Sequence, residues 1–118
     1  MEVPVTIYTH NNTLIFDLLE ENSVSKGLRK QLTNDLAVRF DSAKIHGALD
    51  VPEVIQITLV VAEHLAEAVA AGLITYYLLK KLDRDEAKVT KLEIGSVTVD
   101  VDKDKIRKIV LKKIRRTS

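Results

Sequence analysis

The feature that most constrains this chain is an unusually apolar stretch over residues 51–82. Asp50 is a preferred helix N-cap, and Pro52 is tolerated in a first helical turn. Lys80 and Lys81 stand where cations favour the negative end of a helix dipole. These signals predict one continuous helix, about 45 Å long at the standard rise of about 1.5 Å per residue.

Polar side chains occupy only one narrow stripe of this predicted helix. A helix that is apolar nearly all round must be covered on several sides or face lipid. Because a small sheet covers one side, we expect another polypeptide, either a second copy or an effector protein, to cover the rest. Complete burial within the chain is the alternative. The candidate interface residues are Leu59, Ala62, Ala66, Val69, Ala70, Leu73, Tyr76 and Tyr77.

A membrane span is disfavoured although the stretch is long enough. Glu63, His64 and Glu67 would lie near the middle of the bilayer, where each carboxylate costs about 2.5 kcal/mol or more. The N-terminus has no basic region followed by an apolar one, so no signal peptide is expected. The absence of Cys fits a cytoplasmic protein.

The residues before the apolar stretch carry mixed patterns. Residues 3–8 alternate, which predicts a strand with Pro4 either at a sheet edge or among its first residues. Leu14 to Leu19 fits a hairpin strand or a short helix, and the hairpin is favoured because acidic neighbours would oppose the helix dipole. The next predictions are a helix over 23–33, a strand over 36–40 and a loop over 41–49 that holds His46 and Gly47.

After the apolar stretch, residues 89–94 and 97–101 alternate around Gly95 and Ser96, which predicts a hairpin. Asp102 then caps a final helix, whose inward residues are Ile106, Ile109, Val110 and Ile114. The predicted fold is a single α+β domain over residues 1–118. A small mixed sheet of β-hairpins packs on one long central apolar helix with shorter helices, in the order ββα-β-α-ββ-α.

The sequence offers little for catalysis. Without Cys there are no disulfides, thiolates or Cys-ligated zinc. Glu63, His64 and Glu67 could present an imidazole and a carboxylate to a metal or substrate, but another ligand would have to come from His10 or His46. We interpret the group as the solvated stripe of the helix. No catalytic, cofactor or metal residues are predicted, and the chain is not expected to be an enzyme.

The final helix is strongly basic. Such a helix can neutralise phosphates or approach anionic lipid. Aromatic residues for base stacking and nucleic-acid motifs are lacking, so nucleic acid is disfavoured and a solvated outer face is favoured. Membrane-surface or nucleic-acid binding through this helix is the alternative function. Its candidate residues are Lys105, Lys108, Lys112, Arg115 and Arg116.

Several segments follow the order of a known bacterial family. They are Gly47-Ala48 within Ile45–Leu49, the run from Ala68 to Leu73, Lys80-Lys81, the strand–Gly95–strand unit with Asp100, and Ile106 to Leu111. In this order the chain resembles the effector-associated constant component proteins. It departs from them in lacking a Trp in the first helix and a basic cluster directly after the long helix.

The resemblance implies a non-enzymatic component of a bacterial conflict or immunity system that works beside a separate effector. Together with the apolar stretch, it predicts an interaction or oligomerisation module. We expect this module to self-associate or to dock an effector through the long helix.

Overall fold

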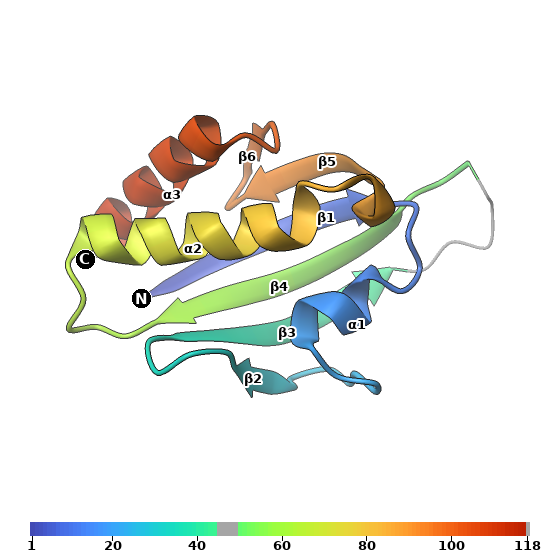
Figure 1. The fold of residues 1–118 in the computed structure, drawn as a ribbon, viewed down its shortest axis with the longest axis horizontal. Helices are drawn as coiled ribbons and strands as arrows, with labels where there is room; N and C mark the ends of the chain where they lie inside the picture. The colour runs from blue at the N-terminus through green and yellow to red at the C-terminus, as the bar shows by residue number, and fades with distance from the viewer. Residues whose placement is uncertain (45–49, 118) are drawn as a thin grey trace.

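The computed structural model describes residues 1–44 and 50–117 and shows an α+β fold built on one six-stranded antiparallel sheet (Figure 1). The strand order is β2-β3-β4-β1-β5-β6. The predicted loop residues His46 and Gly47 lie outside the described residues. In chain order the elements are β1 (Glu2–Thr9), α1 (Leu14–Leu19), β2 (Arg29–Gln31), β3 (Leu36–Lys44), β4 (Glu53–Val61), α2 (Glu67–Leu82), the 3-10 turn η1 (Asp85–Ala87), β5 (Val89–Ile94), β6 (Val97–Val99) and α3 (Lys103–Thr117).

The three helices cover one face of this sheet. In Figure 1, α2 lies in front of β1, with α3 on one side of it and α1 on the other. Alternate residues of β1, such as Val3, Val5 and Ile7, are buried beneath the helices. Their neighbours Glu2 and Pro4 are exposed on the opposite face. The core is therefore a single layer between sheet and helices.

The predicted first strand is confirmed, and its position explains Pro4. β1 is central, and it pairs with β5 only from Val5 onward. Pro4 thus lies at the beginning of the strand on that side, where a missing N–H breaks no ladder bond. Its carbonyl accepts a hydrogen bond from the Gly95 N–H at 2.8 Å.

The prediction of one continuous helix over 51–82 is wrong. Residues Glu53–Val61 form the inner strand β4, and only Glu67–Leu82 form α2. Most residues of β4 are β-branched and fit a pleated surface better than a helix. Asp50 is an exposed turn residue and not a helix cap. Instead, α2 begins after Ala66, which offers no side-chain cap, and ends as expected just after Lys80 and Lys81.

The favoured hairpin over Leu14 to Leu19 is also wrong, because this segment is the helix α1. Its buried residues are Leu14, Leu18 and Leu19, the stripe of the helical alternative. The acidic residues that argued against a helix have cationic partners outside the segment. The Lys81 ammonium lies 3.2 Å from Glu20, the Lys30 ammonium lies 2.8 Å from Glu21, and Arg84 pairs with Asp17.

Residues 23–33 do not form the predicted helix. Gly27 has a φ of +88°, which interrupts a helix, and Arg29–Gln31 pair with β3 as the short strand β2. Val24, Leu28 and Leu32 still pack against the core, as their apolar character suggested. The strand expected over 36–40 is confirmed and is longer, because β3 runs to Lys44 through residues predicted as loop.

The C-terminal hairpin and helix are confirmed, although the second strand, predicted over 97–101, ends at Val99. β5 and β6 form a hairpin around Gly95 and Ser96, and α3 buries Ile106, Val110 and Ile114 while Ile109 is half-buried. Among the described helices, none is long and apolar enough to cross a membrane.

Candidate functional site

The most distinctive surface of the described chain is the solvent side of α2. Between Glu67 and Lys80 this helix has no charged residue. Val69 is 52% exposed and Tyr76 is 68% exposed, although both are large and apolar. A soluble surface helix normally carries polar residues on its outer side. We call the strip formed by Val69, Gly72, Leu73, Tyr76 and Leu79 the α2 outer face.

Helical spacing explains why these residues share one side. Val69, Leu73 and Tyr76 follow each other at intervals of four and three, which aligns them along a helix. Gly72 and Leu79 lie beside them and are partly exposed. Leu79 was missed among the sequence candidates, although the same spacing counted from Tyr76 would have found it.

The structure divides the eight candidate interface residues. Leu59, on β4, is fully buried, and so are Ala70 and the ring of Tyr77 on the inner side of α2. Ala62 follows β4, and Ala66 is the exposed N-cap residue of α2. Three candidates remain on the α2 outer face: Val69, Leu73 and Tyr76.

Tyr77 locks α2 to α1. Its hydroxyl donates a hydrogen bond of 2.7 Å to the Leu18 carbonyl in the core. Burial of the ring raises the pKa of the Tyr77 hydroxyl well above its usual range, and the nearby Glu20 carboxylate adds to this. The inner side of α2 is therefore committed to the fold, which leaves only the outer side for a partner.

Charged residues border the α2 outer face. On the α3 side, Arg115 Nε lies 3.1 Å from Glu67 Oε2. On the α1 side, the Lys81 ammonium reaches Glu20 at 3.2 Å. The strip between these ion pairs is apolar, and an apolar centre within a polar rim is the usual anatomy of a protein interface.

The Glu63, His64 and Glu67 group does not assemble into a site. Glu63 and His64 precede α2, so the three side chains do not share a helix face. Glu63 contacts the Met1 amino group at 2.7 Å, His64 lies 3.5 Å from Asp35, and Glu67 pairs with α3. Among the described residues, no group of three His, Cys, Asp or Glu side chains could hold a metal ion.

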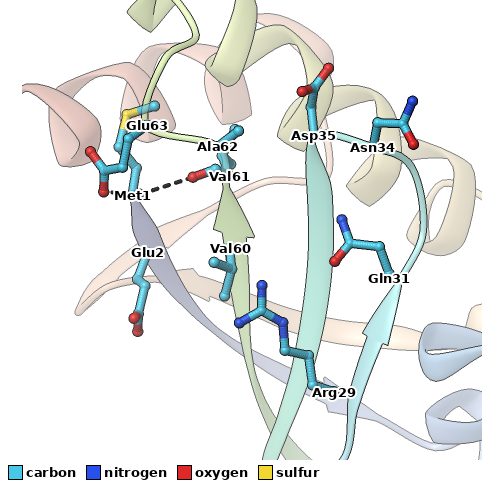
Figure 2. A pocket seen from close by; sticks show the side chains of 10 residues that line it. All are labelled: Met1, Glu2, Arg29, Gln31, Asn34, Asp35, Val60, Val61, Ala62 and Glu63. Atoms are coloured by element: carbon cyan, nitrogen blue, oxygen red, sulfur yellow. Dashed lines mark hydrogen bonds and ion pairs between the residues drawn. The ribbon is translucent and has the colours of Figure 1, made fainter.

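A hollow of about 540 Å³ lies at one end of the sheet, lined by the start of β1, by β2 and the turn that follows it, and by the end of β4 (Figure 2). Glu2, Asp35 and Glu63 bring carboxylates to it, and Arg29 brings a guanidinium. No imidazole lines it, and its carboxylates do not converge into a metal-binding group within the described chain. Its residues thus offer polar contacts without a nucleophile–base pair.

The uncovered sheet face carries a polar network. The Thr58 hydroxyl donates to Asp41 Oδ2 at 2.6 Å and accepts from Arg39 at 3.2 Å. Arg39 Nε also donates to Asp41 Oδ1 at 2.8 Å, and its pKa is raised chiefly by that bond. Nearby, the Tyr8 hydroxyl donates to Glu93 at 2.9 Å, which raises the pKa of Tyr8. The polar groups of these side chains are paired with each other across the strands. We interpret the pairs as stabilising the sheet.

The basic residues of α3 fall into paired and unpaired groups. Lys105 lies 2.7 Å from Asp100, and Arg115 pairs with Glu67. Lys108, Lys112 and Arg116 form no ion pair with any residue that the structure describes. α3 holds eight cations and one carboxylate in a chain with a net charge of +1, so the rest of the chain is acidic.

The chain was compared with family models, with curated proteins and with solved structures, and none of the three comparisons finds a match.

Proposed function

We propose that this protein is a non-enzymatic interaction module that self-associates through the α2 outer face. The observation that carries the proposal is the absence of charge from residue 68 to residue 79 on a helix that is exposed along one side. Tyr76 is a strong candidate anchor because Tyr combines a large apolar ring with a polar tip and is enriched at interfaces.

The partner we propose is a second copy in an antiparallel, two-fold arrangement. A two-fold contact places the same strip on both copies. With the axis between Gly72 and Leu73, Val69 of one copy lies against Tyr76 of the second copy. The same axis sets the small Gly72 against the larger Leu73, so that the two surfaces interlock.

Charge and dipole favour the antiparallel orientation. Lys80 is exposed at the C-terminal end of α2, and Glu63, at 85% side-chain exposure, precedes the N-terminal end. Antiparallel helices bring each Lys80 toward the acidic end of the other copy. They also place the positive end of each helix dipole beside the negative end of the other. Parallel helices would bring like ends together.

The expected affinity is modest. A helix of 16 residues is about 24 Å long, so the strip lies at the small end of specific protein interfaces. We therefore expect a dissociation constant in the micromolar range. The resemblance to the effector-associated constant component proteins supports a place beside a separate effector in a bacterial conflict or immunity system. The α2 outer face is then also the surface for which that effector competes.

A site-specific cross-link tests the proposed contact. The chain has no Cys, so Leu73→Cys introduces a single thiol next to the proposed axis. Mild oxidation should link two copies in high yield, because a disulfide forms only where the two Cβ atoms come within about 4.5 Å. The readout is the fraction of dimer on a non-reducing gel.

The control is Asn12→Cys, at an exposed turn far from α2 in the sequence. It should form little dimer under the same oxidation. Equal cross-linking of both variants would mean random collision, and no cross-linking of Leu73→Cys would remove the α2 contact from consideration.

A further inference from the structure

A second feature of the molecule is a small cavity between the β5–β6 turn and the last two turns of α3. Its volume is about 180 Å³. Its lining combines apolar side chains with three cationic ones. We call it the turn pocket; its residues are Ile94, Gly95, Ser96, Val97, Ile109, Lys112, Lys113 and Arg116.

The turn places the cations. Gly95 has a φ of +63° while Ser96 has a negative φ, the pattern of a two-residue type II′ hairpin turn. A Cβ on Gly95 would stand 3.4 Å from Cε and Nζ of Lys113, so this ammonium lies over the turn. Lys112 and Arg116 are four residues apart and share the side of α3 that faces the turn.

The lining of the turn pocket supplies no counter-charge for its cations. None of its lining residues is acidic. Lys112 and Arg116 form no ion pair with a residue in the described part of the chain, whereas Lys105 and Arg115 on the same helix do. Cations held this close repel each other, and an oxyanion between them removes that repulsion. The exposed Ser96 hydroxyl is an additional donor at the rim.

The pocket floor limits the ligand further. Ile94 is buried and Ile109 is half-buried, while Val97 is 44% exposed at the mouth. The helix dipole alone accounts for cations in the last turn of α3. It does not account for the apolar residues beside them, which would suit an apolar part of a ligand. The volume is below the range of drug-sized sites, which suits one phosphate group with a short apolar substituent.

We propose that the turn pocket binds the phosphate of a phosphomonoester, with Lys112 and Arg116 on the oxyanion and the apolar substituent on Ile94, Val97 and Ile109. Arg and Lys are the usual partners of phosphate in proteins, and hydrogen bonds to an ionised group are the strong ones. The pocket is built within one chain, so this proposal does not depend on the α2 outer face.

The test is a titration of the full chain with inorganic phosphate and with phenyl phosphate at constant ionic strength, followed by amide chemical shifts. We expect saturable shifts at Ser96, Val97 and residues 112–116, with tighter binding of phenyl phosphate. The double variant Lys112→Gln/Arg116→Gln should weaken binding about tenfold or more, since it removes charge-assisted hydrogen bonds.

The matched control is Lys103→Gln/Lys108→Gln, which removes the same charge from exposed positions of the same helix outside the pocket. It should keep the original affinity, and so should Tyr76→Glu on the α2 outer face. Equal weakening by both double variants, or no saturable shift, would overturn the proposal.

A parallel arm uses vesicles that contain phosphatidic acid, whose headgroup is a phosphomonoester. Binding of phenyl phosphate alone assigns the site to a soluble ligand. Vesicle binding that is lost in Lys112→Gln/Arg116→Gln and kept in the control assigns it to a lipid headgroup. Vesicle binding lost equally in both double variants, without soluble binding, would mean general attraction to the basic helix and would reject the pocket.

Discussion

Gly72 lies inside α2, and a Cβ at this position would meet no heavy atom within 4 Å. Glycine costs about 1 kcal/mol relative to Ala within a helix, because its unfolded backbone has more freedom to lose. Gly72→Ala should therefore raise the free energy of unfolding by about 0.5–1 kcal/mol. The measurement is urea denaturation, made in a Tyr76→Glu background so that self-association does not contribute.

Gly95→Ala is the matched control, and it should change the free energy of unfolding in the opposite direction. Its φ of +63° strains any residue with a Cβ, and an added Cβ would stand 3.4 Å from the Lys113 side chain. This variant should lose about 1 kcal/mol of stability. If Gly72→Ala also destabilised the protein, α2 would not be the regular helix described above.

Tyr77 should make the stability of the protein depend on pH in the alkaline range. Its pKa is raised in the folded protein above the ordinary value of 10.0, chiefly because the ring is buried. A group whose pKa is raised by folding contributes fully to the free energy of unfolding when the pH is below its pKa in the unfolded chain. That contribution is lost as the pH rises from the unfolded pKa toward the folded pKa. Stability should thus fall by up to about 1.4 kcal/mol per pH unit above about pH 10.

Tyr77→Phe separates this effect from other groups. At neutral pH it should cost about 1–2 kcal/mol, because the buried Leu18 carbonyl loses its donor. Above pH 10 its stability should fall less steeply than that of the unmodified protein in urea denaturation. Tyr76→Phe, on the exposed side of the same helix, should keep the original slope; a slope that is equal in all three proteins would contradict the role of Tyr77.

Among the secondary-structure elements, α1 depends most on its packing against the sheet. A helix of six residues is too short to be stable alone, so it depends on burial of Leu14, Leu18 and Leu19. Leu18→Ala should destabilise the protein by about 2–5 kcal/mol. Phe16 lies on the same helix and is 39% exposed, so Phe16→Ala should lower the free energy of unfolding by about 1 kcal/mol or less. Comparable losses in thermal or urea unfolding would show that α1 does not dock as described.

The elements that local pattern predicted correctly are those whose signals lie within the element itself. β1 alternates cleanly, the β5–β6 hairpin has a Gly-Ser turn, and α3 has an amphipathic repeat after Asp102. For α1 the local pattern is misleading, because Lys81 and Arg84, which pair with the acidic residues Glu20 and Asp17, are more than 60 residues away. No local rule contains those pairs.

β4 and α2 were merged for a similar reason. The cations at Lys80 and Lys81 do mark the end of a helix, whereas Asp50 lies in the turn before β4 and caps no helix. The β-branched run of residues 54–61 was the local signal for a strand. What makes β4 a strand is its pairing with β3, the element before it, and with β1, which lies about 50 residues away in the sequence.

The candidate site was partly predictable. The apolar character of the helix identified Val69, Leu73 and Tyr76, and these remain on the outer side of α2. Leu59 and Tyr77 were included because the helix was taken to be long and evenly apolar, whereas the fold buries both. The turn pocket escaped notice, since it depends on how α3 packs against a hairpin turn.

At the scale of the whole molecule, the three helices form one layer on the sheet, with α2 in the middle. The flanking helices use ion pairs to hold α2 and leave its outer strip uncovered within the described chain. An apolar strip at the centre of a helical layer is a surface that a second copy can cover symmetrically. We therefore expect the protein to self-associate through this strip.

Sedimentation equilibrium measures this self-association without a label or a cross-link. The unmodified chain, of 13.2 kDa, should pass from monomer to dimer across the micromolar range. Tyr76→Glu should stay monomeric because it would bury a charge in the contact, whereas Asn12→Glu, with the same charge change at an exposed turn, should behave like the unmodified chain. A monomer of 13.2 kDa at all these concentrations, or a dimer that Tyr76→Glu leaves intact, would contradict the account.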